Sequence, residues 1–165
     1  MLGCSGSIGG QLRTTALLLD HDVLIDAGTG VGALSLDELC RIDHVFLTHS
    51  HLDHIAFIPL MLDSVIGRRE HPLIIPALPE TLETLQLHIF NWKVWPDFSQ
   101  IPDSQHPYMR YQSIEIGEVF MLNGRAISPV PANHVVLQLD NNWIAELLAW
   151  YSQVTPLLMM IFGEM

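Results

Sequence analysis

Short apolar runs, separated by turn residues, recur through the first 130 residues of the chain and alternate with amphipathic stretches. Runs rich in Val, Ile, Leu, Phe and Thr are typical of strands, whereas apolar residues three and four positions apart are typical of helices. The pattern predicts strands at 14–20, 23–26, 43–48, 73–77, 111–115, 119–122 and 125–130. It predicts helices at 36–41, 55–65 and 79–90. Because the two kinds of element alternate without an internal repeat, we expect one α/β domain.

Local signals mark where several of these elements begin and end. Ser35 followed by Glu38 has the spacing of a capping box, which predicts the start of a helix. Pro79 is typical of the first turn of a helix, and Gly67 of a helix end. Asn123-Gly124 lies between two apolar runs and predicts a tight hairpin turn.

The last part of the chain carries a different pattern. Residues 143–162 are rich in Trp, Leu and Met, but Glu146 and Pro156 interrupt them. The uninterrupted apolar run, 157–162, is much shorter than the roughly 20 residues that a membrane-spanning helix needs. The N-terminus lacks the basic start and apolar stretch of a signal peptide. We therefore expect no membrane partner, and a core-seeking helix or an atypical hydrophobic tail over 137–165.

Composition and charge narrow the function classes. Of the 165 residues, 49% are apolar and 15% charged, which excludes a disordered chain. The formal net charge of −11 argues against a protein that holds nucleic acid through phosphate contacts, so we expect no nucleic-acid partner. Two cysteines, Cys4 and Cys40, are too few for a disulfide scaffold, so we expect a reducing compartment, the cytoplasm. We expect both thiols to be buried.

Four potential metal ligands, His49, His51, Asp53 and His54, lie within six residues directly after the predicted strand 43–48. His49 and His51 are two apart, so both can point the same way from an extended segment. Imidazole and carboxylate groups bind zinc, and open α/β sheets bind ligands at the carboxyl ends of their strands. This one segment could serve two metals about 3.5–4 Å apart, as in two-metal hydrolases. A polar turn with scattered histidines is the alternative.

The segment His-Ser-His-Leu-Asp-His at 49–54 matches the HxHxDH motif of the metallo-β-lactamase fold. Around this motif the chain resembles the class II cyclic-nucleotide phosphodiesterases. The likeness includes the loop at 25–30, the aromatic stretch at 90–96 and the segment 131–134. Leu52 matches the Leu that this family carries at that position, whereas many ribonuclease-like and thioesterase-like members of the fold carry Gly there. Phe57 departs from the family, which has Gly or Ser there. The resemblance runs from about Leu2 to His134.

This resemblance implies an αββα sandwich and a hydrolase with two zinc ions. By position, His49, His51 and His134 would hold one metal, and Asp53 and His54 the other. The implied reaction is hydrolysis of 3′,5′-cyclic nucleotides (cAMP or cGMP) to 5′-monophosphates, by water that the metals activate. Asp53 could also carry the proton for the leaving oxygen. Asp26, at the end of the predicted strand 23–26, could orient a ligand histidine.

The family pattern breaks after His134. No further histidine follows, and Asp140 is too close to His134 to match the bridging aspartate of the family. We therefore expect an incomplete metallo-β-lactamase-like domain at 1–136 and an atypical tail at 137–165, as a truncated or frameshifted gene would give. Whether the chain binds two zinc ions, one or none stays open, as does whether it forms a homodimer. The alternatives to a phosphodiesterase are another phosphoesterase or RNA-processing nuclease of this fold, and an inactive fragment.

Residues outside the motif can have structural roles instead of functional ones. The aromatic residues of the 90–98 segment could stack a nucleobase or pack on the core, and both remain open: Phe90, Trp92, Trp95 and Phe98. Glycines at 28, 30 and 32 predict a shaped turn rather than a phosphate cradle. Five histidines have no partner motif and are expected at the surface or at helix ends: His21, His44, His71, His88 and His106.

Overall fold

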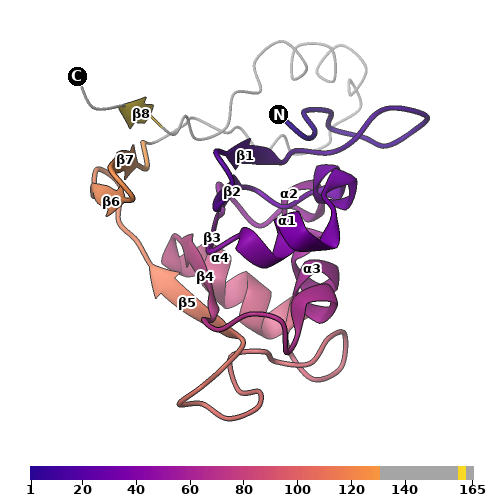
Figure 1. Ribbon diagram of the computed structural model, residues 1–165, viewed down its shortest axis with the longest axis vertical. Coiled ribbons are helices and arrows are strands. Elements are labelled where there is room, and N and C mark those ends of the chain that lie inside the picture. Colours follow the sequence, from indigo (N-terminus) through magenta and orange to yellow (C-terminus); the bar gives the residue numbers. More distant parts are fainter. Residues whose placement is uncertain (131–159, 163–165) are drawn as a thin grey trace, which may run out of the picture. The chain divides into compact units, whose positions relative to one another are not determined.

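A five-stranded sheet organises the first of two units that the chain forms (Figure 1). The computed structural model describes residues 1–130 and 160–162, and the units are Met1–Ile114 and Glu115–Met165. The strands of the first unit are β1 (Leu17–Leu19), β2 (Val23–Ile25), β3 (His44–Phe46), β4 (Leu73–Ala77) and β5 (Met109–Ser113). They lie in the order β1-β2-β3-β4-β5, with β1 antiparallel to β2 and every other neighbouring pair parallel. The carboxyl ends of β2, β3, β4 and β5 therefore share one edge of the sheet.

Short helices connect these strands, which confirms the α/β prediction. They are η1 (Thr29–Ala33), α1 (Leu36–Arg41), α2 (Leu52–Ile55), α3 (Ile58–Val65), α4 (Pro79–Thr84) and the π-helical η2 (Leu85–Ile89). The predicted capping box is present at the start of α1, where Ser35 and Glu38 exchange hydrogen bonds. Within 1–130 and 160–162, none of the helices has the length and apolar character to cross a bilayer.

The core of the first unit joins the sheet to its helices. Leu24 and Val45, which are paired across β2 and β3, and Ile75 of β4 are fully buried in one apolar cluster. Ile58 and Leu62 of α3 belong to the same cluster. Strands buried in this way read as continuous apolar runs, which explains why the sequence pattern located β2 and β4 so closely.

The main differences from the prediction concern one helix, one strand and one cysteine. The expected helix at 55–65 is two helices, because Pro59 cannot continue α2 and instead lies in the first turn of α3. β5 begins two residues early, since buried Met109 pairs with Leu73. Cys4 is exposed, contrary to expectation; it lies between Gly3 and Ser5, which form isolated bridges to Ala16 and Thr14.

The second unit contains an antiparallel three-stranded sheet. Its strands are β6 (Phe120–Leu122), β7 (Arg125–Ser128) and β8 (Met160–Phe162), in that order. The predicted turn at Asn123-Gly124 is confirmed, and both residues have the positive φ (50° and 81°) that a two-residue hairpin turn requires. Met160–Phe162 forms a strand that pairs with β7, so the helix, one of the two alternatives for this stretch, is wrong at these residues.

One buried hydroxyl supports a stability prediction of unusual sign. The side-chain oxygen of Tyr111 is buried without a hydrogen-bond partner among the described residues, and this burial, with the negative charge of Asp97, raises the pKa of Tyr111. Because an unpaired buried polar group is costly, we expect Tyr111→Phe to raise the free energy of unfolding by about 1 kcal/mol in urea titrations. Tyr108→Phe is the control, with a change within about 0.5 kcal/mol. A clear loss of stability in Tyr111→Phe would contradict the structure at this point.

Candidate metal centre

The HxHxDH segment follows β3 and meets the loop that follows β2. His51 is the N-cap of α2, so Asp53 and His54 lie in the single turn of that helix. The backbone N–H of Ala27 donates to the carbonyl of His54 at 2.6 Å, and that of Phe57 donates to the carbonyl of Ala27 at 2.9 Å. Because β2 and β3 are parallel neighbours, the residues after their carboxyl ends come together, as the sequence analysis expected for this edge.

Asp26 is the buried anion at this junction. Its residue is 1% exposed, and its φ of 57° is in the left-handed region, which Asp tolerates better than most residues. The carboxylate accepts hydrogen bonds from the backbone N–H of Thr48 at 2.9 Å and from the Thr48 hydroxyl at 2.8 Å. It also accepts one from Nδ1 of His54 at 2.7 Å. This carboxylate therefore ties the β2 loop to both ends of the motif.

These contacts define the protonation of two histidine rings. A carboxylate only accepts, so Nδ1 of His54 carries the proton, and neutral His54 presents the lone pair of Nε2. The Thr48 hydroxyl donates to Asp26 and can accept from Nδ1 of His49, 3.0 Å away. The same tautomer follows for His49. Thr48 is the functional residue that sequence reasoning missed, and a hydroxyl directly before the motif was the available signal.

His54 is poised to exchange a proton. Its burial disfavours the imidazolium, but the hydrogen bond and negative charge of Asp26, with the charge of Asp53, outweigh burial and raise the pKa of His54. Oδ2 of Asp53 lies 3.4 Å from Nε2 of His54, on the side of the ring away from Asp26. When the neutral ring becomes imidazolium, the added proton lies on Nε2. A metal ion that bound Nε2 would compete with that proton, so metal binding would be coupled to proton release.

The ring positions and donor types fit a zinc site, although the described residues do not complete one. The His49 ring centroid lies 4.5 Å from that of His51 and 4.2 Å from that of His54. Imidazole nitrogen and carboxylate oxygen are zinc donors, and Asp26 is placed as the outer partner that ligand histidines have. Within 1–130 and 160–162, however, no three such side chains are grouped to hold one ion. His134, the remaining predicted ligand, lies outside the described residues.

The glycine loop beside the motif is closely packed. A Cβ at Gly28 would overlap the Asp53 carbonyl oxygen and the Thr14 hydroxyl, and one at Gly30 would lie 2.8 Å from the backbone of Leu2 and Gly3. A Cβ at Gly32 would lie 2.9 Å from Cε1 of Phe57, the residue that departs from the family. The loop therefore shapes a turn against the motif, as the sequence analysis expected.

The aromatic residues of the 90–98 segment differ in burial. Phe90 and Phe98 are core residues at 2% exposure, so the base-stacking alternative is wrong for these two. The carbonyl of Phe98 accepts from Met109, the first residue of β5, which lies at the amino edge of the sheet and away from the motif. Trp95 packs against the core, and Trp92 is exposed.

Comparison with known proteins gives relatives of two activities. A ribonuclease Z of Treponema pallidum is 38% identical over 96 residues, which are 52% of this chain and 30% of that protein. The 3′,5′-cyclic-nucleotide phosphodiesterase of Schizosaccharomyces pombe is 30% identical over 95 residues, 57% of this chain and 25% of that enzyme. The chain thus matches less than a third of the length of either relative.

A solved structure and a family pattern complete the comparison. The metallo-β-lactamase fold protein YhfI from Bacillus subtilis superposes with a TM-score of 0.61 at 18% identity, over 98% of this chain and 56% of that one. The pattern of the class-II cAMP phosphodiesterases matches residues 37–156, and so continues past His134, where the resemblance was expected to end. This match covers most of the chain. The chain belongs to the class-II cAMP phosphodiesterases and has the metallo-β-lactamase fold.

Proposed function

We propose that the chain is a zinc-dependent phosphodiesterase that hydrolyses 3′,5′-cyclic nucleotides to 5′-monophosphates. The observation that carries this proposal is the junction of Asp26 with the HxHxDH segment, in a chain of this family. Asp26 and Thr48 hold Nδ1 of two histidines, so that each ring can offer Nε2 to a metal. A cyclic nucleotide is the expected partner.

His49, His51 and His134 would hold one zinc ion, and Asp53 and His54 a second. Zinc, when bound, would supply Lewis acidity toward the phosphate and a nucleophile from water at neutral pH. Asp26 keeps His54 in the tautomer that offers Nε2. In the reaction, the oxygen of water bonds to phosphorus, the bond from phosphorus to the 3′ oxygen breaks, and that oxygen takes a proton. Asp53, 32% exposed beside His54, is the residue proposed to hold that proton.

The function is tested by incubating the full chain with zinc and 3′,5′-cAMP, and separating products by chromatography. We expect 5′-AMP and no 3′-AMP, and loss of product in His51→Ala. Activity on cGMP, measured in parallel, gives the preference between the two nucleotides. Absence of 5′-AMP from zinc-loaded, folded protein would contradict the proposal for this chain.

An RNA-processing nuclease is the second candidate, and the identity to ribonuclease Z favours it. Leu52 and the net charge of −11 speak against it. Incubation with a precursor tRNA distinguishes the two: discrete cleavage of this RNA without hydrolysis of cAMP would replace the first candidate with the second.

His51→Ala also separates a metal ligand from a polar turn residue. His51 is exposed, so we expect little change in stability, but a loss of zinc affinity of about 100-fold or more, because the site loses a donor. Competition titration with a coloured zinc chelator measures this. His88→Ala, an exposed histidine outside the motif, is the matched control and should bind zinc like the parent. Equal affinity in the two variants would remove His51 from the ligand set.

A further inference from the structure

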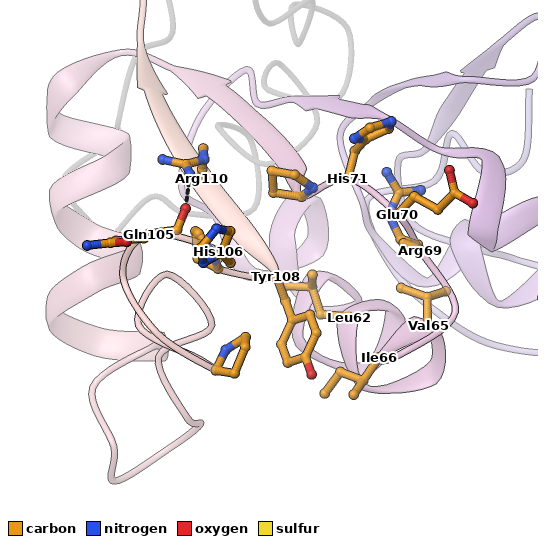
Figure 2. Close-up of a pocket in the computed structure, with 13 residues that line it drawn as sticks. Leu62, Val65, Ile66, Arg69, Glu70, His71, Gln105, His106, Tyr108 and Arg110 are labelled. Carbon is orange, nitrogen blue, oxygen red and sulfur yellow. Dashed lines mark hydrogen bonds between the residues drawn. The ribbon is translucent and has the colours of Figure 1, made fainter.

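A pocket opens at the edge of the sheet opposite the metal motif (Figure 2). Its volume is about 340 Å³, within the range of small-molecule sites. One wall comes from the end of α3 and the residues before β4, and the other from the residues before and at the start of β5. Because β3, β4 and β5 are parallel, this amino edge is remote from the carboxyl ends where the HxHxDH segment lies. We call it the amino-edge pocket.

Arg69 is a built-in cation of the first wall. Its side chain is only 7% exposed, and its guanidinium pairs with Asp43 at 2.9 Å and donates to the carbonyl of Cys40. These contacts hold the guanidinium in place. The Nε of Arg69 is buried and has no hydrogen-bond partner among the described residues. The contacts with Asp43 and Cys40 use two of the five N–H groups of Arg69, and because Arg69 lines the pocket, the guanidinium has further N–H groups for a ligand.

The second wall contributes another guanidinium. Arg110 donates to the carbonyl of Gln105 at 2.7 Å, which uses one of its five N–H groups and fixes its direction. His71 and His106 line the pocket from the two walls, so that donors come from both sides (Figure 2). Only seven residues of the chain are Lys or Arg, and two of them line this one pocket.

Acidic groups near the pocket limit its positive charge. Glu70 lines the pocket, Asp43 pairs with Arg69, and Asp103 lies 3.3 Å from His106. The ligand must therefore be recognised by directed hydrogen bonds from guanidinium groups rather than by net charge alone. Tyr108 and the apolar side chains of α3 supply the rest of the lining, which suits a ligand with an apolar or aromatic body.

We propose that the amino-edge pocket binds a small phosphate monoester with an aromatic or apolar body. The phosphate oxygens would accept from Arg110, from a remaining Nη–H group of Arg69 and from His71, while the body would lie against Tyr108 and the end of α3. A phosphate presents oxygens in several directions and can reach both walls, and guanidinium forks match its geometry. This site is independent of the proposed zinc chemistry, because no residue of the motif contributes to it.

Calorimetric titration of the full chain with phenyl phosphate tests the site, after metal has been stripped over a chelating resin so that the metal motif cannot bind the anion. We expect saturable binding, tighter than that of inorganic phosphate or of phenol. Arg110→Gln should weaken it by about tenfold or more, because a charged fork is lost. Glu70→Gln should tighten it, since the nearby negative charge is removed. Lys93→Gln, an exposed cation outside the pocket, should change nothing.

Several outcomes would overturn the proposal. The first is the absence of saturable binding up to about 10 mM, because a dissociation constant above this value corresponds to very weak binding. The others are an unchanged affinity in Arg110→Gln and weaker binding in Glu70→Gln. Inorganic phosphate that binds as tightly as phenyl phosphate would reduce the site to a simple anion site and reject the apolar part. Circular dichroism of each variant ensures that a loss of binding is not a loss of folding.

Discussion

Gly28→Ala is expected to destabilise the protein by about 3 kcal/mol or more, because the added methyl group has no room. Its Cβ would overlap the Asp53 carbonyl oxygen and the Thr14 hydroxyl, and would lie 2.8 Å from the Thr15 carbonyl oxygen. Two of these atoms are backbone and cannot rotate away. The third belongs to a reciprocal pair in which Thr14 and Thr29 each bind the other's N–H, at 2.8 and 2.7 Å. Urea denaturation measures the loss.

Gly67→Ala is the matched control for that substitution. Gly67 has a φ of 69°, but a Cβ there would meet nothing within 4 Å. Backbone strain alone should therefore cost about 1–2 kcal/mol. If Gly28→Ala were no more destabilised than Gly67→Ala, the close approach of the β2 loop to the metal motif would be wrong. Since the Asp53 backbone is one of the atoms displaced, Gly28→Ala should also lower zinc affinity.

Asp26 is the second residue at which a large effect is expected. Asp26→Ala would leave the N–H and hydroxyl of Thr48 and Nδ1 of His54 without their acceptor, and the site is 1% exposed. Each such loss costs about 1–3 kcal/mol, so a total of about 3 kcal/mol or more is expected. Zinc affinity should fall by about 10- to 100-fold, as for other outer partners of ligand histidines.

Asp26→Asn separates charge from shape at the same position. The amide can still accept from Thr48, so the stability loss should be smaller than in Asp26→Ala. Because the negative charge of Asp26 raises the pKa of His54, that pKa should fall in the metal-free Asp26→Asn protein, which NMR titration of the ring measures. Asp63→Asn, on the exposed side of α3, should change stability by less than about 0.5 kcal/mol. An unchanged pKa of His54 would contradict the contact.

The sequence alone was enough to locate the strands that are buried on the sheet. β4 was predicted residue for residue, and β2 to within one residue, because their side chains form unbroken apolar runs. β5 was displaced by two residues, since its start depends on the pairing of Met109 with Leu73, which lie far apart in the chain. Pro59 was a signal for the break between α2 and α3, but the continuous apolar stretch around it predicted a single helix.

The site was predictable in its residue types and less so in its contacts. Three histidines and an aspartate in alternation at the end of a strand indicate metal chemistry without any structure. The bond between Asp26 and His54 joins residues 28 positions apart, and only the parallel pairing of β2 and β3 brings them together. The tautomers of His49 and His54 follow from that contact and from Thr48, so they could not be derived from spacing.

The claim that the HxHxDH segment is a metal centre is tested most directly by the zinc content of the full chain. Protein purified without chelator, reloaded with zinc and freed of excess ion, is analysed by elemental mass spectrometry beside His51→Ala and His88→Ala. We expect about one zinc ion or more per chain in the parent and in His88→Ala, and a clear loss in His51→Ala. Folded parent protein that holds no zinc, or a His51→Ala variant that holds as much as the parent, would contradict it.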